Sequence, residues 1–410
     1  MSTRSKATSD LRDGIQNPPP RDNQQPMTTA RDIPFIDSQA ALEDLCAVLS
    51  QASWFAIDTE FLREKTYYPI LCLVQVATPD VVACIDPLSL DDMTPLLDVI
   101  YDSGITKVMH AARQDMEIFY HMRGAVPAPV FDTQIAALLL GLPDQVGYGG
   151  LVQELLGVRL HKLHSRTYWS QRPLDDSQIH YAADDVIYLA QAYELIQEKL
   201  QEAGRLDWLT GDLRALSDPA LYAAHPENAW LRVKGTNKLS GAALATLQAL
   251  AAWREEKAQA SDRPRGWLLR DDVLLDIARH RPDTPASLGK IRGLHENIVR
   301  KHGRELLALV LKAADTVPAP LPRTKLRQRL TPSQDAAVDV MQAVVRLVGE
   351  ENRINPSVLA NRNQLEQLLL GNSDVPVLQG WRRQLAGERL QGFLDGKLNI
   401  RMSGGELSIT

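Results

Sequence analysis

Acidic residues recur in three segments of this chain with the spacing of a metal site for phosphodiester chemistry. Asp58 and Glu60 end an apolar strand pattern, and residues two apart on a strand point to the same side. Asp115 follows in a helical pattern, and Tyr181 and Asp185, four apart, share a face of a second predicted helix. Carboxylates are the ligands that Mg²⁺ and Mn²⁺ prefer, and four can hold a cation pair for in-line displacement at phosphorus. The sequence therefore predicts a nuclease.

The order of these segments resembles the DEDD superfamily of 3′→5′ exonucleases, in its tyrosine-bearing branch. Two further segments, YYPILCLVQVA (67–77) and HSRTYWSQRPL (164–174), narrow the resemblance to the bacterial ribonuclease D family. The resemblance implies a ribonuclease H-like α/β fold and two divalent cations, Mg²⁺ or Mn²⁺. It also implies a set of catalytic residues, with the carboxylates as metal ligands and the tyrosine orienting the attacking water: Asp58, Glu60, Asp115, Tyr181 and Asp185.

A histidine offers an alternative to the catalytic tyrosine. The other branch of the superfamily carries a histidine five residues before its last aspartate, where this chain has His180. At about 100° per residue, Tyr181 lies roughly 40° from Asp185 around the helix, and His180 roughly 140°. We therefore predict Tyr181. We also expect at least one of the four carboxylates to have a raised pKa without cations, because like charges repel.

Bulk composition narrows the class of protein. The 410 residues exceed one ordinary domain, and a hydrophobic content of 44% suffices for real cores. No apolar run is long enough for a membrane span, no signal peptide is evident, and three cysteines in apolar stretches suggest reduced core residues of a cytoplasmic protein. The net charge of −6 argues against a general nucleic-acid binder, yet residues 230–330 carry 20 Lys plus Arg against 10 Asp plus Glu. Such a basic region is typical of phosphate-backbone binding.

Periodicity predicts an α/β part followed by helices. Three closely spaced strands (54–61, 70–77 and 81–85) predict an antiparallel meander, and later helix and strand patterns complete a mixed sheet flanked by helices. From about residue 237 only helical patterns are recognised. The first helical segment resembles the HRDC module shared by RecQ helicases and ribonuclease D, and segment 356–371 resembles 270–284, which suggests a second, divergent HRDC-like module.

These patterns predict the following domain organisation. A disordered N-terminal extension precedes the exonuclease domain, a linker leads to the first HRDC domain, and a Pro/Arg-rich linker leads to the second, so that the fold is an α/β domain followed by two all-α domains. The expected boundaries, in that order, are 1–30, 31–212, 213–236, 237–316, 317–333 and 334–410.

Basic and aromatic residues outside the acidic segments are candidates for RNA contacts. Gln75 and Tyr67 lie near the first acidic segment and are placed to touch the terminal nucleotide. The others are basic residues beside aromatic or helical segments, a mixture that contacts phosphates and unpaired bases: Arg166, Arg172, Arg263, Arg265, Lys290 and Arg292.

The favoured function is a metal-dependent 3′→5′ exoribonuclease, monomeric and cytoplasmic. By resemblance it trims the 3′ ends of precursor tRNAs and other small structured RNAs, and releases nucleoside 5′-monophosphates. One alternative is a DNA 3′→5′ exonuclease for proofreading or repair, although no P-loop or other polymerase or helicase signature accompanies the acidic segments. Another is a non-catalytic RNA-binding adaptor, which the complete set of four carboxylates and a tyrosine disfavours.

Overall fold

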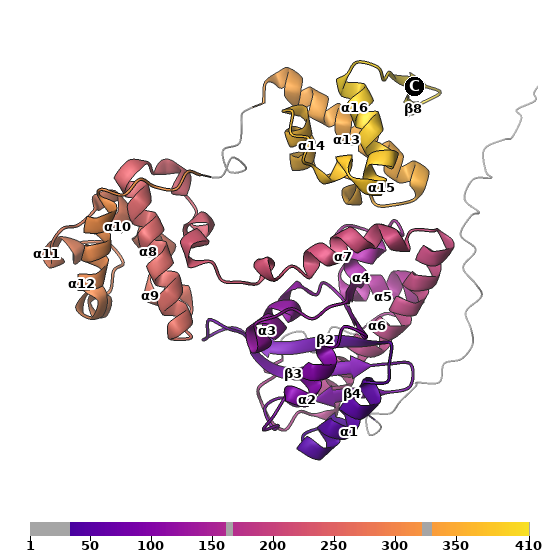
Figure 1. Ribbon diagram of the computed structural model, residues 1–410, viewed down its shortest axis with the longest axis horizontal. Coiled ribbons are helices and arrows are strands. Elements are labelled where there is room, and N and C mark those ends of the chain that lie inside the picture. The colour runs from indigo at the N-terminus through magenta and orange to yellow at the C-terminus, as the bar shows by residue number, and fades with distance from the viewer. Residues whose placement is uncertain (1–32, 161–166, 322–329, 410) are drawn as a thin grey trace, which may run out of the picture.

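Three folded parts follow one another along the chain in the computed structural model, which describes residues 33–160, 167–321 and 330–409. An α/β part comes first, a helical module follows, and a second helical module ends in a short hairpin (Figure 1). The predicted disordered extension, residues 1–30, lies outside the described residues.

A mixed sheet forms the centre of the α/β part. Its strands are β1 (Phe35–Ile36), β2 (Trp54–Leu62), β3 (Ile70–Ala77), β4 (Val82–Ile85), β5 (Thr106–Met109) and β6 (Val130–Asp132). They lie in the order β1-β4-β3-β2-β5-β6. The predicted antiparallel meander of β2, β3 and β4 is confirmed, and β5, β6 and β1 pair in parallel with their neighbours. Strand β1 was not predicted, because two residues are too few to show an alternating pattern.

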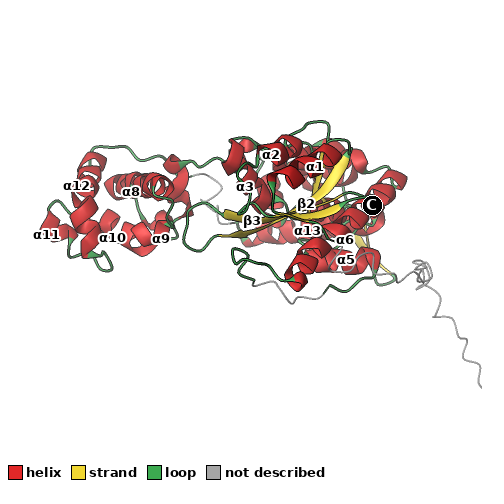
Figure 2. Cartoon of the chain, turned by 90° about the horizontal axis from the view of Figure 1, so that it is seen from below, coloured by secondary structure: helices red, strands yellow, loops and turns green. Residues whose placement is uncertain are grey.

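Helices cover both faces of this sheet (Figure 2). They are α1 (Gln39–Leu49), α2 (Thr94–Ile100), α3 (Arg113–Arg123), α4 (Thr133–Leu138), α5 (Tyr148–Leu156), α6 (Asp176–Glu202) and α7 (Thr210–Leu216). Apolar side chains of α1, α2 and α3 form one core with the sheet, and those of α4, α5 and α6 form another on the opposite face. The sheet thus fixes the first turns of α3 and the whole of α6 relative to β2.

The second part is a helical module with its own core. It contains α8 (Gly241–Ala260), α9 (Arg265–Leu268), α10 (Asp271–His280), α11 (Pro285–Leu288) and α12 (Glu296–Ala313). Helix α12 is continuous through Gly303. Gly303 is buried inside this helix, and a Cβ there would make only ordinary contacts, at 3.5 Å from the Val299 side chain and 3.6 Å from that of Leu288.

The third part is helical and ends in a hairpin. It contains α13 (Pro332–Asn352), α14 (Arg362–Leu369), α15 (Gly380–Arg382) and α16 (Glu388–Leu394), followed by β7 (Ile400–Ser403) and β8 (Glu406–Ile409). The two strands are an addition to the helices expected here. Gly404 and Gly405 join them with φ of 63° and 90°, the positive values that a tight hairpin turn requires.

This third part packs against the α/β part through a shared core. Apolar side chains of α13, α14 and α16 belong to the same cluster as those of α5 and α6. The Trp208 and Trp381 rings stack 4.4 Å apart, and the Trp381 indole N–H donates to the Trp208 carbonyl at 3.1 Å. Arg382 pairs with Asp212 at 2.6 Å beside them. The two parts therefore form one hydrophobic unit although they are distant in the sequence.

Replacing Trp381 by Ala is expected to destabilise this unit. Complete burial of a tryptophan contributes roughly 3–5 kcal/mol, and because Trp381 is half-buried we expect a loss of about 2 kcal/mol. Urea unfolding measures this loss. The control is Trp267→Ala on α9, which should change stability by less than about 0.5 kcal/mol because Trp267 is 59% exposed. Equal losses in the two variants would contradict the shared core.

Two bulk predictions can be compared with the described residues. Cys46, Cys72 and Cys84 are free and buried, as expected of reduced core residues. None of the described helices is long and apolar enough to cross a membrane.

Candidate active site

Strand β2 brings Asp58 and Glu60 to one face of the sheet. Ala56 has the same orientation on this strand and packs in the core under α6, so the two carboxylates also face α6. The pairing of β2 with β3 shifts register immediately after Glu60. Such a bulge bends a strand and redirects its side chains. The two carboxylates share a face of β2 as predicted, but they lie within the strand and not at its end, because β2 continues to Leu62.

Asp115 approaches from α3 and is tied to β2 by a hydrogen bond. It is buried in the first turn of α3 and accepts a 2.5 Å hydrogen bond from the Thr59 hydroxyl. Asp132, at the end of β6, accepts hydrogen bonds from the backbone N–H groups of Ala111 and Ala112, just before α3. These contacts fix where α3 begins. The sequence analysis missed Thr59, whose position between the two acidic residues was the available signal.

Helix α6 supplies Tyr181 and Asp185. A capping box at Asp175 starts this helix, and the Trp169 ring lies 6.2 Å from that of Tyr181. Burial, together with the charges of Asp185, Glu60 and Asp58, raises the pKa of Tyr181 to about 12. The phenol therefore lies close to three of the four predicted ligands.

All four carboxylates have raised pKa values, and for Asp58 and Glu60 the charges of the other candidate ligands contribute to the rise. The pKa of Asp58 is raised well above its usual range, by burial first and then by Asp115, Asp185 and Glu60. Burial also raises the pKa of Glu60 to about 8, of Asp185 to about 7 and of Asp115 to about 6. The expectation of at least one raised carboxylate pKa is confirmed. These shifts indicate a site that lacks compensating positive charge.

The residues fit divalent cations in chemistry. Their donors are carboxylate oxygens, which Mg²⁺ and Mn²⁺ prefer. Within the described ranges, no three His, Cys, Asp or Glu side chains lie close enough together to hold an ion as they stand. Electrostatic coupling acts over longer distances than coordination. Asp58 therefore responds to the charges of the other three carboxylates, although no three of these groups lie close enough together to hold an ion. Bound cations would offset the repulsion between these carboxylates and allow them to draw together.

Tyr148 is a further residue near this site that the sequence analysis missed. Its hydroxyl donates to the Asp184 carbonyl at 2.9 Å, and its ring meets that of His110 edge-on. Burial raises the pKa of Tyr148 well above its usual range, and the charges of Asp185 and Asp58 add to this shift. No local sequence pattern predicted this residue, because Tyr148 comes near the site only when α5 packs in the folded protein.

Tyr67, predicted to touch the terminal nucleotide, lies at the junction with the second part. Its hydroxyl donates to Glu255 on α8 at 2.5 Å, and Arg265 on α9 donates to that hydroxyl at 3.1 Å and lies over the ring. Asp262 accepts hydrogen bonds from the backbone N–H groups of Tyr67 and Tyr68, both at 3.0 Å. Tyr67 therefore joins the β2–β3 loop to the helical module of the second part.

Two other predicted RNA contacts are not available at the surface, Arg172 because it is bound within the protein and Gln75 because it is buried. The Arg172 guanidinium donates to both carboxylate oxygens of Asp86, at 2.5 and 2.7 Å, and to the Cys72 carbonyl. Gln75 is completely buried on β3. Arg166 lies outside the described residues.

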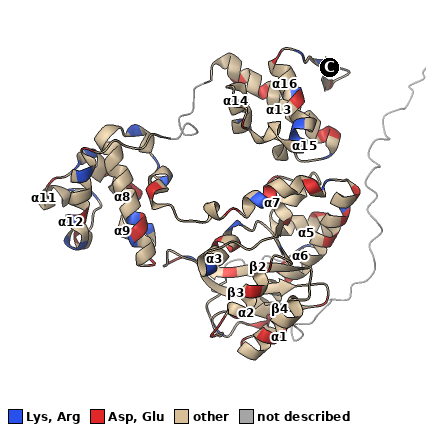
Figure 3. Ribbon diagram, in the orientation of Figure 1, with Lys and Arg blue, Asp and Glu red and all other residues tan. Residues whose placement is uncertain are grey.

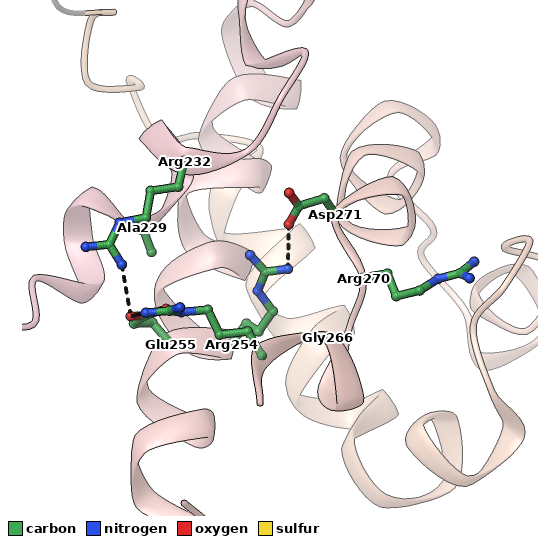
Figure 4. Close-up of a pocket in the computed structure, with 8 residues that line it drawn as sticks. Ala229, Arg232, Arg254, Glu255, Gly266, Arg270 and Asp271 are labelled. Atoms are coloured by element: carbon green, nitrogen blue, oxygen red, sulfur yellow. Dashed lines mark hydrogen bonds and ion pairs between the residues drawn. The ribbon is translucent and has the colours of Figure 1, made fainter. Parts of the chain in front are cut away.

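The remaining predicted contacts are on the surface of the second part, where Lys and Arg gather (Figure 3). Arg263, Lys290 and Arg292 are exposed. Arg265 instead lines a pocket of about 350 Å³ between α8, α9 and the turn at 226–232, where Glu255 binds it. Figure 4 shows this pocket, with Arg232 reaching Glu255.

The comparisons with known proteins agree with this geometry. A family of 3′-5′ exonucleases matches residues 33–201, and the HRDC domain family matches residues 243–310. Ribonuclease D of Sphingobium indicum is 38% identical over 92% of this chain and 98% of its own, and that of Gluconacetobacter diazotrophicus is 40% identical over 88% and 93%. The crystal structure of Escherichia coli RNase D, described as an exoribonuclease involved in structured RNA processing, superposes with a TM-score of 0.77. It is 33% identical and covers 89% of this chain and 99% of its own.

The mixed sheet and its match to the exonuclease family, followed by an HRDC domain, define a 3′→5′ exonuclease with an appended helical domain. The chain is an enzyme of this class. Its similarity over nearly the whole length of curated relatives shows that it belongs to the ribonuclease D family. The HRDC family matches the second part of the chain, and the third part is a helical region.

Proposed function

We propose that this enzyme is a metal-dependent exoribonuclease that trims the 3′ ends of precursor tRNAs and other small structured RNAs, as a cytoplasmic monomer. The observation that carries the proposal is the buried acidic cluster from β2, α3 and α6, in which the charges of Asp115, Asp185 and Glu60 act on Asp58 and raise its pKa. Family membership supports RNA as the substrate. Nucleoside 5′-monophosphates are the expected products.

Asp58, Glu60, Asp115 and Asp185 would hold two Mg²⁺ or Mn²⁺ ions. When bound, such a pair lowers the pKa of the attacking water and neutralises charge on the scissile phosphate. Tyr181 keeps its proton at neutral pH, because its pKa is raised to about 12. Its hydroxyl therefore orients the attacking water and does not act as a general base. The nearness of Tyr181 to three carboxylates supports this role over one for His180.

RNA upstream of the cleaved nucleotide has a basic and aromatic cavity available to it. A cavity of about 500 Å³ lies between α3, the β2–β3 loop and the turns at 219–232. Arg113 lines it, as do three arginines that are paired with carboxylates, Arg63 with Glu117 and both Arg232 and Arg265 with Glu255. Four tyrosines contribute rings: Tyr67, Tyr68, Tyr120 and Tyr222. This mixture suits a single strand with unpaired bases.

We propose that Arg172 holds the loop before α6. We also propose that the third part is a divergent HRDC-like domain.

The exposed Lys290 and Arg292 on the HRDC domain are proposed to bind the RNA body through its phosphates. The double variant Lys290→Gln/Arg292→Gln should weaken binding of a precursor tRNA and lower the slope of log K against log salt by about 1.8, because each duplex phosphate contact contributes about 0.9. Filter binding at several salt concentrations measures the slope. Cleavage of a short oligonucleotide should be unchanged. Lys199→Gln, on exposed α6 surface, is the control, and an equal change there would contradict the assignment.

The direction of cleavage and the need for cations are tested on a 5′-labelled RNA with an unpaired 3′ tail. The proposal requires a ladder that shortens from the 3′ end and stops on addition of EDTA. Internal fragments without a ladder, or cleavage that persists in EDTA, would contradict it.

A further inference from the structure

Gln75, in the middle of β3, presents a buried polar group without a partner. The residue has no exposed surface, and neither the nitrogen nor the oxygen of its side-chain amide has a hydrogen-bond partner. Buried polar groups in native proteins are nearly always hydrogen-bonded, since an unpaired one costs stability. A group of this kind in the centre of a sheet calls for a functional explanation.

The strand register places this amide beside the first metal ligand. Gln75 lies directly opposite Asp58 on β2 and opposite Cys84 on β4. Directly opposite residues on antiparallel strands share one face, with Cβ atoms about 4.5–5.5 Å apart. The Cys84 thiol is directed to the Ile179 carbonyl of α6. Of these two cross-strand neighbours, Asp58 carries the strong acceptor.

We propose that Gln75 is a positioning residue of the metal site, whose side-chain N–H donates to the Asp58 carboxylate when cations are bound and fixes its orientation. Being completely covered by α6 and the sheet, the amide is placed to act through Asp58 and not on the nucleotide. Hydrogen bonds to a metal ligand orient it, and their loss typically lowers metal affinity about 10–100-fold. The inference rests on the metal site of the proposed function.

Gln75→Met tests this role, because methionine has a similar length and no hydrogen-bonding requirement. In EDTA the variant should unfold at the same temperature as the wild type or about 2–4 °C above it, since an unpaired buried amide has been removed. A glutamine kept for packing or for an internal hydrogen bond would give the opposite sign. Differential scanning calorimetry in EDTA provides this measurement.

Metal binding is the second measurement and needs no RNA. The dissociation constant for Mn²⁺, followed by electron paramagnetic resonance, should rise at least about tenfold in Gln75→Met, and the rise in unfolding temperature on adding Mn²⁺ should shrink. The matched control is Cys84→Ala, because Cys84 is the other cross-strand neighbour of Gln75. It should lower stability equally with and without Mn²⁺ and leave the dissociation constant unchanged.

The outcomes separate this inference from the proposed function. If the wild type binds no Mn²⁺, the metal site and the proposed function both fail. If the wild type binds Mn²⁺ and Gln75→Met binds it equally well, the positioning role alone is overturned. The positioning role is also overturned if Gln75→Met is less stable than the wild type in EDTA. It is overturned, too, if neither Gln75→Met nor Gln75→Leu folds.

Discussion

Asp58→Asn is expected to abolish cleavage while leaving a metal-free protein that is more stable than the wild type. The carboxylate would contribute several kcal/mol of transition-state stabilisation through the cations, and a tenfold loss of rate corresponds to about 1.4 kcal/mol, so cleavage should fall about 10³-fold or more. In the metal-free protein the Asp58 pKa is raised by burial and by Asp115, Asp185 and Glu60. Asparagine removes that unfavourable ionisation, and the gain at pH 7 should be at least about 1 kcal/mol.

Single-turnover cleavage of a short RNA and urea unfolding in EDTA measure the two effects. Asp184→Asn is the matched control, because it removes the adjacent carboxylate of α6, next to Asp185. It should retain most of the activity. A metal-free Asp58→Asn protein that is less stable than the wild type would mean that Asp58 serves a structural purpose, and the electrostatic account of the site would be wrong.

The stability of the metal-free protein should decline as pH rises from about 4 to 8. The folded-state pKa values of Glu60, Asp185 and Asp115, about 8, 7 and 6, lie above their ordinary values of 4.5, 3.8 and 3.8. Between these limits the folded state binds more protons than the unfolded state, so stability is present below pH 4 and is lost as each group ionises. We expect a loss on the order of a few kcal/mol, because one unit of pKa shift corresponds to about 1.4 kcal/mol.

Cations should reverse this trend, because they favour the ionised carboxylates. The measurement is a set of urea unfolding curves between pH 4 and 8, with EDTA or with Mg²⁺. His110 acts in the opposite direction, since burial lowers its pKa, but it contributes to both series and cancels in their difference. A difference that does not grow with pH would show that the four carboxylates do not share a cation site.

The sequence could indicate the candidate site residues because their geometry is local within each element. Asp58 and Glu60 share a face since a strand repeats every two residues, and Tyr181 and Asp185 share one since a helix repeats every 3.6 residues. The order of the segments then allowed a family resemblance, which supplied the convergence of β2, α3 and α6. Thr59 was missed for a related reason, because its side chain points to the opposite face and meets Asp115 only once α3 has packed.

Contacts between distant segments could not be predicted. Tyr67 and Glu255 are 188 residues apart, and no local pattern indicates that a phenol next to the first acidic segment binds a carboxylate on α8. The same is true of Trp208 and Trp381, whose stacking joins the third part to the α/β core. The absence of a partner for the Gln75 amide likewise appears only in three dimensions. Each of these three features depends on packing between segments that are distant in the sequence.

The most direct test of the central claim is digestion of a 3′-extended precursor tRNA and a matched single-stranded DNA, with Mg²⁺ or Mn²⁺, by the wild type and by Asp58→Asn. The account predicts stepwise shortening of the RNA from its 3′ end, release of nucleoside 5′-monophosphates, and loss of both in the variant. Degradation of the DNA alone would establish the repair-type exonuclease instead. Binding of the RNA without any shortening would contradict the catalytic role of the four carboxylates and leave an RNA-binding adaptor.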